Sequence, residues 1–252
     1  MQSLLENVII FDTETTSKDF KEAEIIELSA SVYENGGWAV IHDELYKPRQ
    51  PISPHVSAVN HITNRHVEDK DCFSKHKNTV QELFDGKICV AHNIFYDNEV
   101  LSRNGVDVPN RACTMRMARK LFANYAEVEA YNLSYLRYFF DLDIPEDTPV
   151  HRAAGDVLVT CKLFELLVQA AIETKELEDT PNLANDLLAW IDEPIITNLM
   201  PFGKYRGQTL DSVPLDYWQW ALANMDSLNE EKSEYDRDFA ASVEAALQKI
   251  MQ

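Results

Sequence analysis

The 252-residue sequence has few basic side chains, no paired cysteines and no long apolar run. Lysine and arginine together number 23 against 42 acidic residues, so the formal net charge is −19. This balance argues against non-specific adhesion to nucleic acid or to anionic membranes. It leaves room for a local cationic groove, or for a site in which metal ions carry the positive charge. The placement of the acidic residues therefore matters more than their sum.

The four cysteines form no C-x-x-C pair, so neither a zinc site nor a disulfide scaffold is indicated, and we expect all four to be reduced. No run approaches 18 apolar residues, which excludes a transmembrane helix. The first residues, MQSLLENVII, lack a basic segment, and Asp12 and Glu14 follow soon after, so no secretory signal is indicated. We expect a cytoplasmic protein with no membrane partner.

The order of apolar segments predicts an α/β or α+β domain. Residues 7–12 and 24–33 are predicted strands, and Gly36-Gly37 is a predicted turn into a third strand. A Pro-rich loop and a polar segment are expected to follow, through residue 66. Residues 87–91 form a further predicted strand, and helical spacing is found over residues 73–84, 96–103, 114–122, 133–140 and 153–173. Hairpin strands followed by alternating strands and helices indicate a mixed sheet flanked by helices.

The composition changes after Glu173, where an acidic, proline-containing segment predicts a helix end and a linker. We expect a first domain over residues 1–175, an acidic linker over 176–194 and a small C-terminal α+β domain over 195–252. In the last part, residues 202–207 form a glycine-bracketed turn with basic and aromatic side chains. Its aromatic residues are open to two interpretations, an accessory nucleic-acid-binding role or a small structural core.

Asp12 and Glu14 stand at the end of the first predicted strand. Residues i and i+2 of a strand project to the same face, so both carboxylates can converge on one point. Like charges that close repel each other unless cations lie between them. Hard divalent ions such as Mg²⁺ or Mn²⁺ take oxygen ligands of this kind. A D-x-E pair alone is weak evidence, because most such pairs are solvated surface residues.

Two further acidic residues stand at strand–helix junctions. Asp97 lies in the first turn of a predicted helix, where it could simply complement the helix dipole. Asp156 opens the longest predicted helix near its core-facing side, where an unpaired carboxylate is costly, and this favours a metal or an ion-pair partner. Gly155 leaves room for something to approach that helix. His151, taken singly, is more consistent with a capping or core histidine.

Together these residues form the pattern D-x-E … H-N-x-x-[FY]-D … H-x-A-x-x-D, with 85 and 59 residues between successive aspartates. The pattern resembles the DEDDh family of 3′→5′ exonucleases. Three more segments resemble members of that family that act on DNA: RQPISPHVSAVNHIT (49–63), ACTMRMARKLF (112–122) and PFGKYRGQTLDSVP (201–214). The joint match is far more specific than any of its parts.

The resemblance implies a ribonuclease-H-like fold and removal of nucleoside 5′-monophosphates from DNA 3′ ends. It implies that Asp12, Glu14, Asp97 and Asp156 hold two Mg²⁺ or Mn²⁺ ions, and that His151 is the general base. Independent chemistry agrees, because two cations can activate water on one side of a phosphorus and stabilise the leaving oxygen on the other. A neutral histidine can accept the proton of that water.

The resemblance also suggests substrate contacts, with main-chain N–H groups near Thr15 against the terminal 3′-hydroxyl. Phe95 could equally be a core aromatic residue, and a basic helical strip around Arg116 could equally be a solvated face. The expected substrate-binding residues are Thr13, Thr15, His61, Asn93, Phe95 and Arg116.

The expected partner is the 3′ end of DNA, in single-stranded form, but RNA is not excluded because no residue visibly selects for or against a 2′-hydroxyl. An exoribonuclease on the same scaffold is therefore one alternative. A non-catalytic polymerase-accessory module is another, against which the intact set of acidic residues and His151 argues. A homodimer is a further possibility.

Overall fold

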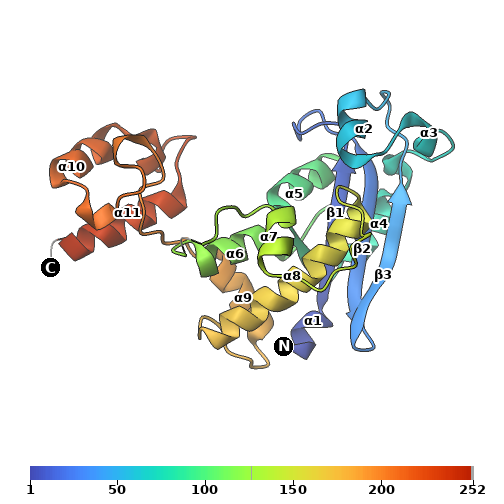
Figure 1. Ribbon diagram of the computed structural model, residues 1–252. Helices are drawn as coiled ribbons and strands as arrows, with labels where there is room; N and C mark the ends of the chain where they lie inside the picture. The colour runs from blue at the N-terminus through green and yellow to red at the C-terminus, as the bar shows by residue number, and fades with distance from the viewer. Residues whose placement is uncertain (126, 251–252) are drawn as a thin grey trace. The chain divides into compact units, whose positions relative to one another are not determined.

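The computed structural model of the protein describes residues 1–125 and 127–250 and divides the chain into two compact units (Figure 1). The first unit comprises Met1–Met117 and Ala130–Trp190, and the second comprises Ala118–Glu129 and Ile191–Gln252. The segment expected as a linker, residues 176–194, contains a helix, α9 (Leu183–Asp192). Among the described residues, no helix has the length and apolar character that a membrane crossing requires.

A five-stranded mixed sheet forms the centre of the first unit, in the order β3-β2-β1-β4-β5. Strand β1 is antiparallel to β2 and parallel to β4, while β2–β3 is antiparallel and β4–β5 is parallel. The mixed sheet expected from the sequence is therefore confirmed. Its strands are β1 (Val8–Thr15), β2 (Ile25–Glu34), β3 (Gly37–Leu45), β4 (Ile88–Ala91) and β5 (Arg111–Cys113).

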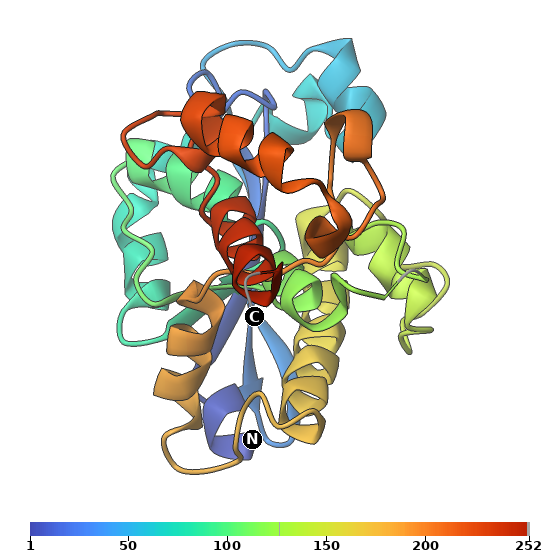
Figure 2. The same cartoon turned by 90° about the vertical axis from the view of Figure 1, so that its left-hand side faces the viewer.

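Helices flank this sheet, and both views show α8 running along it (Figures 1 and 2). The remaining elements up to α8 are α1 (Gln2–Leu5), α2 (Pro54–Asn60), α3 (Asn64–Val67), the 3-10 turn η1 (Phe73–Lys75), α4 (Lys77–Phe84), α5 (Ile94–Arg103), α6 (Thr114–Phe122), α7 (Leu133–Phe139) and α8 (Ala153–Glu173).

Strand β1 is apolar on both faces because helices cover both. Ile9 and Phe11 pack in a core cluster with Phe84 of α4 and Leu101 of α5. Side chains alternate along a strand, so Ile10 and the even-numbered residues after it point to the opposite face, against which α8 packs. The alternation therefore places Asp12 and Glu14 on the α8 face and Thr13 on the α5 face.

The structure differs from the sequence expectation before α4. The segment expected to be loop and polar chain contains α2 and α3. Ser53 caps α2 by accepting a hydrogen bond from the N–H of Val56, and Pro54 occupies the first helical turn. A serine followed by proline is a helix-start signal, but the surrounding prolines masked it. Strand β1 also extends beyond Asp12 to Thr15, with an irregularity in its pairing between Glu14 and Thr15.

The second unit has a core of its own. Trp218, fully buried, packs there with Phe239 and Val243. In its described part, strand structure is limited to an isolated antiparallel bridge between Leu199 and Thr209. Its other elements are the 3-10 turns η2 (Gly203–Tyr205), η3 (Leu210–Ser212) and η4 (Asp226–Leu228) and the helices α10 (Leu215–Asn224) and α11 (Arg237–Ile250).

Candidate active site

Three carboxylates meet at the end of β1. One oxygen each from Asp12, Glu14 and Asp156 lies within 4.8 Å of the other two, and all three side chains are partly buried. Asp12 and Glu14 come from one face of β1, and Asp156 comes from the first turn of α8, which packs on that face. Residues 144 positions apart in the sequence are thus brought to one point by the packing of α8 on the sheet.

Asp97 reaches the same region from the other face of the strand. Its Oδ1 accepts hydrogen bonds from the backbone N–H of Thr13 at 3.1 Å and from the Thr13 hydroxyl at 2.6 Å. Asp97 is almost fully buried in the first turn of α5, and its charge raises the pKa of Asp12. Thr13 therefore fixes Asp97 beside the three-carboxylate cluster.

The electrostatics of the four carboxyl groups reflect burial first and, for Asp12 and Glu14, the like charges around them. Burial, followed by the charges of Asp97 and Asp156, raises the pKa of Asp12 well above its ordinary value. Burial and the charge of Asp156 raise the pKa of Glu14 to about 8. Burial raises the pKa of Asp97 to about 6 against the hydrogen bonds from Thr13, and it raises that of Asp156 to about 6 against the influence of His151. In the absence of a cation, the site therefore retains protons that isolated carboxyl groups would lose.

This donor set fits a divalent metal site. The ligand atoms are carboxylate oxygens, which Mg²⁺ and Mn²⁺ prefer over nitrogen and sulfur. Burial and, after it, like charge raise the pKa values of Asp12 and Glu14, and a cation between the carboxylates would offset both effects. The acidic cluster thus has the oxygen ligands of a divalent metal site and a concentration of negative charge that a cation would neutralise.

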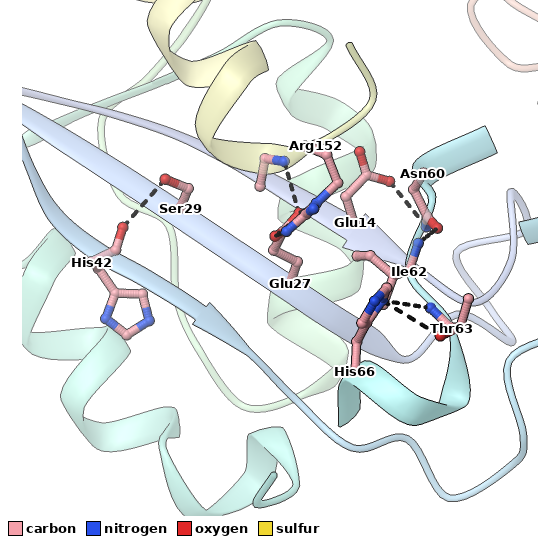
Figure 3. Close-up of polar contacts among 10 residues, drawn as sticks. Glu14, Glu27, Ser29, His42, Asn60, Ile62, Thr63, His66 and Arg152 are labelled. Carbon is pink, nitrogen blue, oxygen red and sulfur yellow. Dashed lines mark hydrogen bonds and ion pairs between the residues drawn. The ribbon is translucent and has the colours of Figure 1, made fainter. Parts of the chain in front are cut away.

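The first turn of α8 is anchored by an ion pair between buried Glu27 and partly exposed Arg152. Glu27 of β2, 2% exposed, accepts hydrogen bonds from the Arg152 guanidinium and, at 2.9 Å, from the N–H of Ala153 (Figure 3). Glu27 lies opposite Glu14 in the β1–β2 register. The pair therefore fixes the start of α8, and with it His151 and Asp156, against the strand that carries the acidic residues.

The loop before α8 packs tightly against this turn. A Cβ at Gly155 would lie 1.9 Å from the carbonyl oxygen of Pro149, so only glycine fits there. The group that approaches the helix at Gly155 is thus the chain itself. His151 follows in the left-handed region, with φ of 56°, and its side chain is exposed.

A groove of about 780 Å³ opens beside the acidic cluster. Asn60 of α2 closes one side and donates a hydrogen bond from Nδ2 to Oε2 of Glu14 at 3.3 Å (Figure 3). Tyr96 of α5 lies on another side, where its hydroxyl contacts the Thr15 hydroxyl at 2.5 Å. The groove is lined by Thr13, Glu14, Thr15, Thr16, Ser17, Lys18, Ser53, His55, Val56, Val59, Asn60, Asn93, Tyr96 and His151.

The residues expected to contact substrate fall into two groups. Thr13, Thr15 and Asn93 line the groove, although the Thr13 hydroxyl is engaged with Asp97. His61, Phe95 and Arg116 are not among its lining residues. His61 is exposed and lies at the C-terminal end of α2. Phe95 is 62% exposed, and its ring packs edge-to-face against that of Phe20, with 5.9 Å between the ring centroids. Arg116 is partly buried in α6.

Several groove residues are not among those expected from the sequence. Tyr96 is the [FY] position of the motif, but the neighbouring Phe95 received the proposed contact instead. Asn60 and His55 were missed because α2 was expected to be loop. His92 of the same motif is structural, since its ring bonds the Thr114 hydroxyl at 2.9 Å and the Tyr131 carbonyl at 2.8 Å, and burial lowers its pKa to about 4.

Comparison with known proteins places this site in a family. The model of the RNase T family, described as exonuclease, matches residues 9–164 and so spans all four acidic residues and His151. The chain belongs to this exonuclease family. It is therefore a nuclease, a hydrolase of phosphodiester bonds, with the DEDDh pattern found in its sequence. A second family model, described as a quorum-sensing-regulated virulence factor, matches residues 191–224.

Individual proteins similar to this exonuclease are also nucleases or DNA polymerase subunits. Exodeoxyribonuclease 10 of Escherichia coli K12 is 26% identical over 229 residues, which cover 88% of this chain and 93% of the relative. DNA polymerase III subunit epsilon of Treponema pallidum is 29% identical and covers 63% of this chain and 74% of the relative. Among solved structures, exonuclease X in complex with 5′ overhanging duplex DNA has a TM-score of 0.54 and 25% identity, covering 72% of this chain and 99% of that chain. Escherichia coli exonuclease I with a dT13 oligonucleotide has a TM-score of 0.53 at 17% identity, covering 67% and 42%, and shares the fold.

Proposed function

We propose that this exonuclease is a 3′→5′ exodeoxyribonuclease that removes nucleoside 5′-monophosphates one at a time from DNA 3′ ends. The observation that carries the proposal is the three-carboxylate cluster of Asp12, Glu14 and Asp156 at the edge of a groove that also contains His151. A phosphodiester lying in this groove would meet the ligands for a cation and a proton acceptor at the same end.

The proposed ligands are Asp12, Glu14 and Asp156, with Asp97 beside them, and they would hold two Mg²⁺ or Mn²⁺ ions. When bound, such ions supply the positive charge that lowers the pKa of water and stabilises the leaving 3′ oxygen. Thr13 orients Asp97 for this role through two hydrogen bonds to Oδ1. The Asn60 amide does the same for Glu14 through Oε2.

His151 is the proposed general base. Its side chain lines the groove, and its charge acts on Asp156, so the ring lies near the acidic cluster. A ring nitrogen of neutral His151 accepts the proton of the attacking water. The Glu27–Arg152 pair holds the following turn of α8, so the base and Asp156 keep a fixed relation to the strand residues.

The groove is the proposed site of the terminal nucleotide. Hydroxyl and amide groups of Thr15, Asn93 and Tyr96 line it together with the apolar side chain of Val59. A sugar edge can bond the polar groups while a base packs on the apolar side. We propose a single-stranded 3′ end as the substrate, because one strand presents its terminal base unpaired.

The choice of DNA is supported by the relatives at 25% identity or above. Exodeoxyribonuclease 10 is named for deoxyribonucleic acid, and the exonuclease X structure contains a DNA duplex with a 5′ overhang. No observation on the groove favours a 2′-hydroxyl, so RNA hydrolysis is an outcome of the test and not a second proposal.

The test is a turnover assay with DNA and RNA oligonucleotides of the same sequence in Mg²⁺, with Asp12→Ala as the inactive control. We expect rapid release of nucleoside monophosphates from DNA, slower release from RNA, and none with the variant. Faster hydrolysis of RNA would replace the proposal with an exoribonuclease. Equal activity of Asp12→Ala and the native enzyme would refute the assigned site.

A further inference from the structure

The C-terminal unit contains two tryptophans of opposite environment, two positions apart on α10. Trp218 is fully buried and donates a hydrogen bond from Nε1 to the Leu210 carbonyl at 3.2 Å. Trp220 is 54% exposed. Trp218 therefore contributes to the core of the unit, whereas Trp220 contributes a large aromatic surface to the solvent.

Trp220 is one end of a row of aromatic rings. Its centroid lies 5.6 Å from that of Tyr217, with 40° between the ring planes, and Tyr217 lies 4.8 Å from Tyr205. Tyr205 belongs to the glycine-bracketed turn at residues 202–207, which contains η2. Its contact with Tyr217 joins this turn to α10. The row thus joins two segments of the unit; Tyr205 and Tyr217 are half-buried against its core, and Trp220 is the exposed ring.

Two cations flank this row. The Nζ of Lys204 lies 5.1 Å from the Tyr205 ring centroid, and Arg206 follows on the same turn. Both are exposed, and among the described residues neither has an ion-pair partner. In the same unit, by contrast, Lys232 pairs with Asp226 and Arg237 with Asp192. The chain has a net charge of −19, so cations are in the minority in it. The position of these two beside aromatic rings suits an anionic ligand that also carries planar groups.

We propose that Lys204, Tyr205, Arg206, Tyr217 and Trp220, the aromatic–basic surface, bind a single strand of DNA at a site additional to the catalytic groove. Bases stack on exposed aromatic rings, and phosphates pair with the cations. The acidic side chains of Asp211 and Asp216 lie near in sequence and are exposed, so stacking contributes more of the affinity than charge does. The inference rests on the proposed activity on DNA and assigns a binding site to nucleotides outside the catalytic groove.

The experiment measures binding of fluorescein-labelled dT30 to the full chain in EDTA by fluorescence anisotropy. Stacking contributes about 1–3 kcal/mol per base, so Trp220→Ala should weaken binding at least about fivefold. Trp220→Phe keeps a ring and should restore most of the affinity. The pair Lys204→Ala and Arg206→Ala should reduce the slope of log K against log salt by about 1.4, since each phosphate contact on a single strand contributes about 0.7.

Matched controls separate this surface from general effects. Lys232→Ala removes an exposed cation of the same unit that is already paired, and it should leave both affinity and salt slope unchanged. An abasic deoxyribose-phosphate oligomer of equal length has no bases to stack, so Trp220→Ala and the native chain should bind it equally. Thermal unfolding followed by circular dichroism checks that each variant is folded.

Binding of dT30 within twofold of native by both Trp220→Ala and the Lys204/Arg206 double variant would overturn the inference and leave the surface to another partner. An equal loss of affinity for dT30 and the abasic oligomer in Trp220→Ala would overturn the stacking argument. Hydrolysis of the trinucleotide dT3 tests the catalytic groove separately, and its rate should be the same in all these variants. Absence of hydrolysis of both dT3 and longer DNA oligonucleotides by the native enzyme would refute the proposed function, whatever the binding results.

Discussion

Glu14 and Glu27 lie opposite each other on neighbouring strands. Removing the charge of one should raise the stability of the folded protein, and removing that of the other should lower it. Glu14 lies among like charges, and Glu27 is paired with Arg152. We predict that in EDTA, Glu14→Gln stabilises the metal-free protein at neutral pH, whereas Glu27→Gln destabilises it.

The magnitude follows from the pKa of Glu14. Folding raises it from 4.5 to about 8, so the neutral form is favoured in the folded state. The stability that this provides is fully present below pH 4.5 and is lost as the pH rises through 8. At pH 7 the loss is about 3 kcal/mol, because each pH unit above 4.5 costs about 1.4 kcal/mol. Glu14→Gln removes this cost and should raise Tm by about 6–12 °C.

Glu27→Gln is the matched control. It leaves the partly exposed Arg152 guanidinium without its carboxylate partner, and the loss of these charge-assisted hydrogen bonds costs about 1–3 kcal/mol. The assay is thermal unfolding by differential scanning calorimetry at pH 5, 7 and 8, first in EDTA and then in Mg²⁺. The native protein should gain Tm on Mg²⁺ addition, and more so at pH 8. If Glu14→Gln lowers Tm in EDTA as Glu27→Gln does, the argument that burying the Glu14 carboxylate among like charges is unfavourable is wrong.

Three further predictions concern activity. Asp12→Asn, which removes one carboxylate of the acidic cluster, should lower kcat on the order of a thousandfold without lowering Tm in EDTA, as single-turnover assays and melting curves can check; a loss below tenfold would contradict its proposed role. Arg152→Lys keeps the charge but loses the forked pairing with Glu27, so it should lower kcat more than it raises KM, and a pure KM effect would contradict positioning. The Mg²⁺ concentration for half-maximal rate should rise as the pH falls from 8 to 6, because protons compete for carboxyl groups with pKa values of about 8 at Glu14 and about 6 at Asp156; a half-maximal concentration that is the same at pH 6 and pH 8 would contradict this.

Much of the fold was predictable because it follows local periodicity. The helices over residues 114–122 and 153–173 occur with the predicted bounds, since their apolar residues recur at helical spacing over two or more turns. Segments without such spacing were missed. Strand β5 has three residues, too few to show a period, and α2 lies in a proline-rich, polar segment that is typical of a loop.

The candidate site was predictable in its residues but not in its supports. The alternation of a strand is enough to place Asp12 and Glu14 on one face, and the motif joins them to Asp97 and Asp156. The hydrogen bonds of Thr13 to Asp97 and the Glu27–Arg152 pair join residues 84 and 125 positions apart, respectively. Such contacts depend on how α5 and α8 pack on the sheet, which a single sequence does not specify.

The most direct test of the account is anomalous diffraction from crystals of the enzyme grown in Mn²⁺. The account predicts anomalous peaks between the carboxylates of Asp12, Glu14 and Asp156, and loss of those peaks in Asp12→Asn. The proposed metal site would be contradicted by crystals that show no anomalous peak at the acidic cluster, if protein from the same crystals, once dissolved, hydrolyses DNA in the same Mn²⁺ solution.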